Sequence, residues 1–203
     1  MPRPESPITV TVGATASPCR RADAVRNREA ILEAARGIVA SRGADGLTMD
    51  AVAGEAGVGK GTLFRHFEGR AGLIHALMEF GERDFQERFL TGPPPLGPGA
   101  PAAERIRAFG AALIAHRRAN LPLMMEIRAV AMDHPVYWAW HLHLRLLLDE
   151  AGAVTDAGIA AHLLLAGTDP SLLAKLSEDA TDATWTDLEV AWIAMADGIV
   201  SGG

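Results

Sequence analysis

Apolar side chains recur at three- and four-residue spacing along most of this chain, with charged residues between them. The first such stretch, residues 31–39, predicts a helix that begins near Asp23 and stops at Gly43. Thr48 is a natural N-cap for a short second helix, which Gly57 should end. The N-terminal third of the chain therefore starts as two helices separated by a short connection.

Two more helices follow directly. A third is predicted at residues 59–67, and a longer fourth begins near Arg70. Residues 91–99 are rich in proline and glycine and cannot form a helix interior, so they predict a loop near the boundary between two domains.

Beyond that loop the helical pattern resumes and is punctuated by Pro122, Pro135 and Pro170. Proline is tolerated in a first helical turn, so Pro135 and Pro170 indicate helix starts, and Gly152 and Gly167 indicate helix ends. The last helix should run from about residue 185 to 200. We find no alternating strand pattern and therefore predict an all-α fold of about nine or ten helices.

Composition divides the chain into a tail and two domains. Residues 1–19 hold four prolines among small polar residues and predict a disordered N-terminal tail. Residues 20–75 should form the first domain and residues 76–203 the second. A single cysteine, Cys19, excludes an internal disulfide and fits a reducing cytoplasm. We see no signal peptide or transmembrane helix, and we expect no metal and no cofactor.

The net charge of −6 is unevenly distributed. Residues 19–75 hold nine Lys/Arg against seven Asp/Glu, whereas residues 91–203 hold seven against thirteen. Only the first region can be attracted to phosphate, so the second should lie away from any nucleic acid.

The stretch 47–67 has the pattern of a helix-turn-helix. Two short helices that cross at a tight turn need a small residue at the crossing, which Ala53 supplies, and a residue that tolerates positive φ, which Gly57 supplies. The second helix would then present Lys60 and Arg65 to phosphates or base edges. This predicts DNA binding, with residues 59–67 as the recognition helix.

With these motifs, residues 26–75 resemble the TetR/AcrR-type transcriptional regulators. The resemblance implies an Ω-shaped homodimer, a C-terminal ligand pocket, and release of DNA when ligand binds. By position, the residues that look like the family's phosphate contacts are Thr48, Lys60, Thr62, His66 and Arg70, and those close to bases are Gly61 and Arg65. The family often has tyrosine where this chain has Phe64, so Phe64 either contacts DNA without a hydroxyl or only packs.

Two features of this region have competing interpretations. Arg20 and Arg21 fit a minor-groove arm and a solvated basic tail equally well. Gly54, Gly59 and Lys60 nearly mimic a phosphate-binding P-loop, which would indicate an enzyme. That motif needs Ser or Thr after the lysine and a strand before it, whereas Gly61 follows the lysine and a capped helical turn precedes Gly54. We therefore expect no enzymatic activity.

The second domain offers a candidate ligand site and a candidate dimer interface. Large, adaptable side chains concentrate between residues 106 and 148, and those expected to line an apolar pocket are Phe109, Leu113, Met124, Met125, Trp138 and His141. They favour a small lipophilic or aromatic effector of a repressor. Small residues in the helices at about 156–166 and 185–200 favour a homodimer through a four-helix bundle. An activator, or a regulator that answers only to a protein partner, fits the sequence as well.

Overall fold

The computed structural model describes residues 18–126, 135–178 and 181–201, with side chains from Val25 onward. Within these ranges the chain forms nine α-helices and a short 3-10 turn and has no strand, which confirms the predicted all-α fold. The N-terminal helices are α1 (Pro18–Arg42), η1 (Ala44–Gly46), α2 (Met49–Glu55) and α3 (Lys60–Phe67). The long α4 (Arg70–Thr91) follows, and the others are α5 (Ala102–Glu126), α6 (Pro135–Ala151), α7 (Ala157–Ala166), α8 (Pro170–Ser177) and α9 (Asp182–Ser201).

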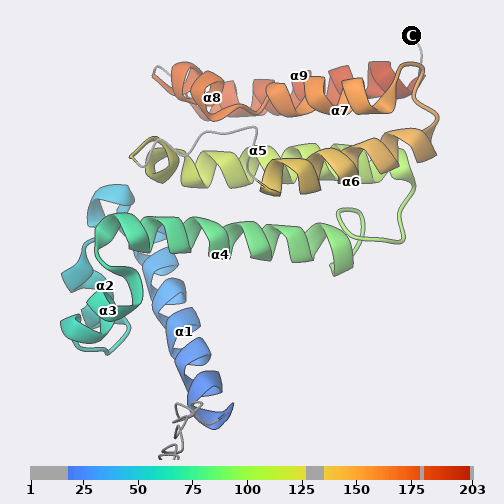
Figure 1. Ribbon diagram of the computed structural model, residues 1–203. Helices are drawn as coiled ribbons and strands as arrows, with labels where there is room; N and C mark the ends of the chain where they lie inside the picture. The colour runs from blue at the N-terminus through green and yellow to red at the C-terminus, as the bar shows by residue number, and fades with distance from the viewer. Residues whose placement is uncertain (1–17, 127–134, 179–180, 202–203) are drawn as a thin grey trace, which may run out of the picture.

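The helices form a small unit at one end of α4 and a layered bundle along its length (Figure 1). α1, α2 and α3 gather around the start of α4, α5 and α6 form the next layer, and α7, α8 and α9 form the outermost layer. The arrangement places the two short helices α2 and α3 far from the outer layer.

Each unit has its own hydrophobic core, and α4 contributes to both. The first core lies in the small unit, called the first unit below, and the second core lies in the layered bundle, the second unit. Its residues from Leu73 to Met78 pack with α1, α2 and α3, whereas Phe85 and Phe89 pack with α5, α6, α7 and α9. The predicted domain boundary at residues 75/76 thus falls inside one continuous helix. Leu123 and Met124, from the end of α5, also belong to the first core, so that core is completed by the second unit.

The predicted start signals of α8 are confirmed, but Pro122 does not interrupt a helix as its position in the sequence predicted. Asp169 caps α8 and Pro170 occupies its first turn. Pro122, in contrast, lies inside α5, which continues to Glu126. The amide of Asn120 donates to the carbonyl oxygen of His116 (2.8 Å), so a side chain supports the helix just before the proline.

Two other predictions about the ends of elements are corrected. α1 begins at Pro18, before the predicted start near Asp23, since proline is compatible with a first helical turn. Residues 1–17 of the predicted tail lie outside the described residues. The loop after α4 is not at the domain boundary, because α4 carries it away from the first unit and Leu96 packs against the second core.

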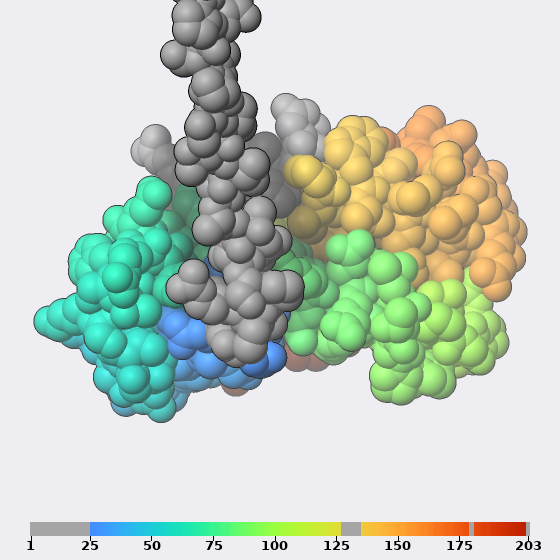
Figure 2. All heavy atoms as spheres, turned by 60° about the horizontal axis from the view of Figure 1, so that its bottom comes forward, coloured from blue at the N-terminus to red at the C-terminus, as the bar shows by residue number. Residues whose placement is uncertain are grey.

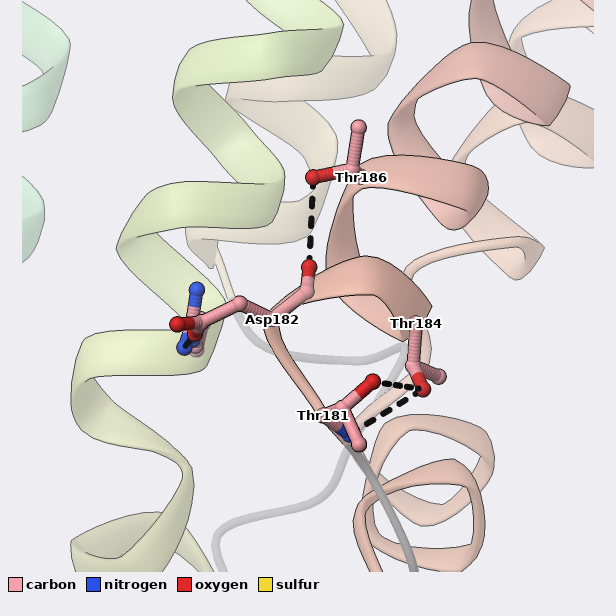
Figure 3. Close-up of polar contacts among 5 residues, drawn as sticks. Thr181, Asp182, Thr184 and Thr186 are labelled. Atoms are coloured by element: carbon pink, nitrogen blue, oxygen red, sulfur yellow. Dashed lines mark hydrogen bonds and ion pairs between the residues drawn. The ribbon is translucent and has the colours of Figure 1, made fainter.

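Polar contacts fix α9 against α5 and α7. Arg118 and Arg107 on α5 pair with Asp182 and Asp197, and the indole nitrogen of Trp192 donates to the carbonyl oxygen of Leu164 (2.8 Å). At the start of α9, the hydroxyls of Thr181, Thr184 and Thr186 bond to one another or to the backbone (Figure 3). The C-terminal helix is therefore held to the bundle along its length.

α7 and α8 together form the only stretch of the described residues with the length and apolarity of a membrane span, Ala157–Ser177. These criteria use length and composition alone, and 44% of the stretch is buried inside the protein. Gly167 divides it into two helices. Such a pattern is typical of core helices as well.

Candidate nucleic-acid interface

Local signals in the sequence build the pair α2 and α3. The hydroxyl of Thr48 accepts from the backbone nitrogen of Ala51 (3.1 Å) and so caps α2. Gly57 adopts φ 65°, the left-handed conformation that the turn needs, and the nitrogen of Val58 donates to the carbonyl oxygen of Ala53 (3.0 Å). The predicted helix–turn–helix is therefore present. Because Gly54 lies in α2 rather than after a strand, the P-loop interpretation is wrong.

α3 has one buried face and one open face. Leu63 and Phe67 are buried in the first core, whereas Lys60, Gly61 and Arg65 are exposed. A side chain at Gly61 would meet no atom within 4 Å, so another molecule can approach the helix backbone there. In Figure 2 this part of the chain forms a protruding end of the molecule, at the left in cyan.

The basic side chains of α3 are already positioned by polar neighbours. Lys60 pairs with Asp50 on α2 at 2.7 Å between Nζ and Oδ2, and Arg65 donates to the hydroxyl of Thr62 at 3.1 Å. The side chains of Lys60 and Asp50 are 62% and 67% exposed, so water screens their attraction. A phosphate could therefore replace the carboxylate at little cost.

Phe64 and His66 differ in their surroundings. Phe64 is 49% exposed and belongs to neither core, so the chain itself gives its ring little to pack against. His66 is half-buried, with its ring 5.9 Å from that of Phe67. Arg20 and Arg21 lie on the first turns of α1, but their side chains are outside the described part, so the minor-groove arm stays a prediction.

Arg70 is the candidate DNA contact whose environment was not anticipated. Its Nε and Nη2 donate to the two carboxylate oxygens of Glu126 at 2.8 and 2.7 Å, and Nη2 also donates to the carbonyl oxygen of Ala44 (3.1 Å). The hydrogen bonds between the two side chains raise the pKa of Arg70 and lower the pKa of Glu126. Arg70 thus joins the first unit to the end of α5, and a phosphate contact would require this pair to open.

The six predicted ligand residues do not all come together, although the rings of Trp138 and His141 lie 5.5 Å apart. Phe109 and Leu113 are fully buried in the second core, and Met124 lies in the first. Met125 is 45% exposed because each residue of a helix is turned by about 100° from the previous one.

On α6, Trp138 is 51% exposed. His141 is half-buried, and its Nε2 lies 3.0 Å from the carbonyl oxygen of Gly158. An open hollow at the far end of α4 is lined by Arg88, residues 93–96, Ala108, Ala111 and Ala112, and by none of the six. Their roles in ligand binding stay predictions.

The sequence did not predict a group of largely buried polar side chains between α4 and α5: Glu82, His116 and Arg117. A signal was present, because Glu82 follows Met78 by four residues and precedes Phe85 by three. It therefore interrupts an apolar stripe of α4. A charged residue inside such a stripe indicates burial.

Known proteins resemble this chain in two ways. Residues 31–77 match the family described as bacterial regulatory proteins, tetR family. Two "HTH-type transcriptional regulators" of Staphylococcus aureus strains are 33% identical over 69 residues and 36% identical over 59 residues. The matches span only 37% and 32% of the length of these relatives.

Solved structures are similar over much more of the chain. A TetR-family transcriptional regulator from Pectobacterium atrosepticum covers 89% of this chain and 97% of its own, with a TM-score of 0.71 and 21% identity. AibR, solved in complex with isovaleryl coenzyme A and operator DNA, covers 83% and 97%, with a TM-score of 0.53 and 20% identity. At these identities the likeness shows the fold.

Proposed function

We propose that this protein is a cytoplasmic repressor that binds operator DNA as a homodimer. Residues 31–77 match the tetR family, and the fold resembles that of a solved TetR-family regulator. The observation that carries the proposal is the open face of α3, where Lys60, Gly61 and Arg65 are exposed beside a turn of the required geometry. The acidic second unit lies away from this face, as repulsion by phosphate requires.

A second copy of the chain is the proposed occupant of the outer face of α7, α8 and α9. These three helices expose large apolar side chains: Ile159, Leu163, Leu172, Leu176, Val190 and Met195. The buried small residues Ala160 and Ala161 let α7 pack closely on the bundle, so its opposite face is free to pair. Two such layers form a helix bundle and place two α3 helices on the same side of the dimer, where they can read two half-sites.

The dimer is tested by placing a charge at its centre. Leu163→Asp should give a monomer in sedimentation velocity, because a buried carboxylate has no partner there. Leu90→Asp, at a similarly exposed leucine of α4, should leave the dimer intact. A dimeric Leu163→Asp variant would rule out this face.

We further propose that a small lipophilic or aromatic effector binds the second unit and releases the DNA. AibR, which has a similar fold, was solved in complex with isovaleryl coenzyme A and operator DNA. In this chain, Leu123 and Met124 belong to the first core, and the Arg70–Glu126 ion pair joins the surfaces of the two units. A change at the end of α5 can therefore reach the core on which α3 packs.

Selection of bound duplexes from a random DNA pool tests the function as a whole. The expected result is a palindrome whose half-sites lie about one helical turn, ~34 Å, or a multiple of it apart. Failure to enrich any sequence, with the protein folded and dimeric, would refute operator binding.

A further inference from the structure

Two histidines from different helices stack against each other on the outside of the second unit. The ring centres of His141, on α6, and His162, on α7, lie 4.0 Å apart. The ring of Tyr137 lies 5.8 Å from that of His162 and nearly parallel to it, and the ring of Trp138 stands steeply against both histidines at 5.5 and 5.8 Å. His162 is exposed and His141 is half-buried, so solvent reaches the pair.

Each imidazole has one nitrogen held by a neighbour. Nε2 of His141 lies 3.0 Å from the carbonyl oxygen of Gly158, which can only accept, so in the neutral ring Nε2 carries the proton and Nδ1 keeps its lone pair. Nδ1 of His162 lies 2.5 Å from the hydroxyl of Tyr137, which can accept as well as donate. Among the described residues, no hydrogen bond is made by Nδ1 of His141 or by Nε2 of His162. Each ring is therefore oriented through one nitrogen, and its other nitrogen is left to bind a further atom.

Histidines that bind metals are usually held in this way. Such a histidine donates its second ring nitrogen to a backbone carbonyl or a similar acceptor, which sets the orientation of the ring and its tautomer. Burial, and then the closeness of His141, lower the pKa of His162 and so favour the neutral form, which is the form that binds a metal. Two nitrogens at about 2.0–2.1 Å from one tetrahedral ion lie about 3.3 Å apart. Rings with centres 4.0 Å apart are close enough for one ion to bind both.

We propose that His141 and His162 bind a divalent transition-metal ion on the surface of the second unit, through Nδ1 of His141 and Nε2 of His162. Imidazole suits Cu²⁺, Ni²⁺ and Zn²⁺, whereas Mg²⁺ prefers oxygen ligands. Within the described ranges, no three histidine, cysteine, aspartate or glutamate side chains gather into a metal site, so the pair supplies two ligands and solvent supplies the others. Tyr137 is a positioning residue, because its hydroxyl orients the ring of His162 through the nitrogen that does not bind the ion.

An ion at this site joins α6 to α7 within one chain. His162 directly precedes Leu163 of the proposed dimer face, but its ring lies against His141 on α6. One ion per chain is therefore expected, without further association of chains. The sequence did not predict this site, because the two histidines are 21 residues apart and only the packing of α6 on α7 brings them together.

Calorimetric titration of the full-length protein with copper, nickel, zinc and magnesium sulfate tests the site. Cu²⁺ should bind once per chain and at least about tenfold more tightly than Ni²⁺ or Zn²⁺, and Mg²⁺ should not bind. Electron paramagnetic resonance of the Cu²⁺ complex should show hyperfine splitting from two nitrogen ligands. A different number of nitrogens, or binding that makes the chains associate further in sedimentation velocity, would overturn the proposal.

Matched variants separate this site from adventitious binding to other histidines. His141→Gln retains a donor for the carbonyl oxygen of Gly158, and His162→Asn retains a group that can bond to Tyr137, but each variant loses a metal ligand. Both should weaken Cu²⁺ binding at least about tenfold, to the level of a single imidazole. Tyr137→Phe should also weaken it about tenfold but keep the splitting from two nitrogens, because only an orienting hydrogen bond is lost. His75→Gln, at an exposed histidine of α4, should leave the affinity unchanged.

Stability gives an independent readout. A metal that binds the folded chain stabilises it, so zinc sulfate should raise the urea midpoint of the parent protein but not that of His162→Asn. Unchanged Cu²⁺ affinity in both His141→Gln and His162→Asn would show that the stacked rings only pack α6 against α7. None of these readouts involves DNA, so their failure refutes the metal site and leaves the proposed function standing.

Discussion

His143 should make the stability of this protein depend on pH in a defined window. It is 8% exposed, and its ring lies 4.4 Å from Phe89 and 5.2 Å from Phe109. Its Nε2 is buried and has no hydrogen-bond partner among the residues that the structure describes. Burial, and then the positive charge of Arg105, lower the pKa of His143 from 6.5 to about 4. The folded protein therefore keeps this imidazole neutral where the unfolded chain takes up a proton.

The sign and size of the effect follow from this difference. A lowered pKa means that the contribution to stability is complete above pH 6.5 and is lost as the pH falls toward 4. Proton linkage with these two values gives a loss of about 2 kcal/mol at pH 5 and about 3 kcal/mol at pH 4. Below pH 4 the loss from this residue levels off, because the folded state also binds the proton.

Urea unfolding at pH 7.5 and pH 5.0 measures this loss. In His143→Leu the decrease in unfolding free energy between the two pH values should be smaller than in the parent by about 2 kcal/mol, because the other groups titrate alike in both proteins. His75→Leu, at an exposed histidine of α4, is the control and should keep the pH dependence of the parent. Identical pH dependence in His143→Leu and the parent would refute a neutral buried imidazole.

The remaining predictions concern DNA contacts and packing. Lys60→Ala should reduce the slope of log affinity against log salt concentration by about one unit, because one phosphate contact is lost, and an unchanged slope in a filter-binding titration would exclude that contact. Glu126→Gln should lower the unfolding free energy by about 0.5–1 kcal/mol, because the Arg70–Glu126 ion pair is partly exposed. It should also steepen the salt slope, because the guanidinium of Arg70 is then free to bind phosphate. If the slope stays the same, Arg70 does not bind phosphate. Gly110→Ala should cost about 1–3 kcal/mol in urea unfolding, because the new Cβ would lie 2.1 Å from Cζ3 of Trp192. Gly37→Ala, which meets no atom within 4 Å, should instead stabilise α1, and equal effects of the two alanines would contradict the close approach.

The helix–turn–helix could be predicted from the sequence because each of its signals is local. The hydroxyl of Thr48, the positive φ of Gly57 and the apolar spacing of α3 act within a few residues of one another. Short-range rules therefore sufficed to place the recognition helix.

The contacts that were missed join positions far apart in the chain. Arg70 and Glu126 are 56 residues apart, and Glu82 and His116 are 34 apart. Such pairs depend on how α4 crosses α5, which helical periodicity does not determine. For the same reason a list of large side chains between residues 106 and 148 could not distinguish Phe109, inside the core, from Trp138, on the surface.

Leu123 and Met124 limit how this protein can be recombined with its relatives. These two residues of α5 complete a core otherwise built by α1, α2, α3 and the first turns of α4. A chimera that joins this DNA-binding unit to another sensor at the middle of α4 would leave an apolar gap unless the new sensor supplies side chains of similar shape. Successful exchange therefore requires the end of α5 to be transplanted together with the first 80 or so residues, although it lies more than 30 residues further along the chain.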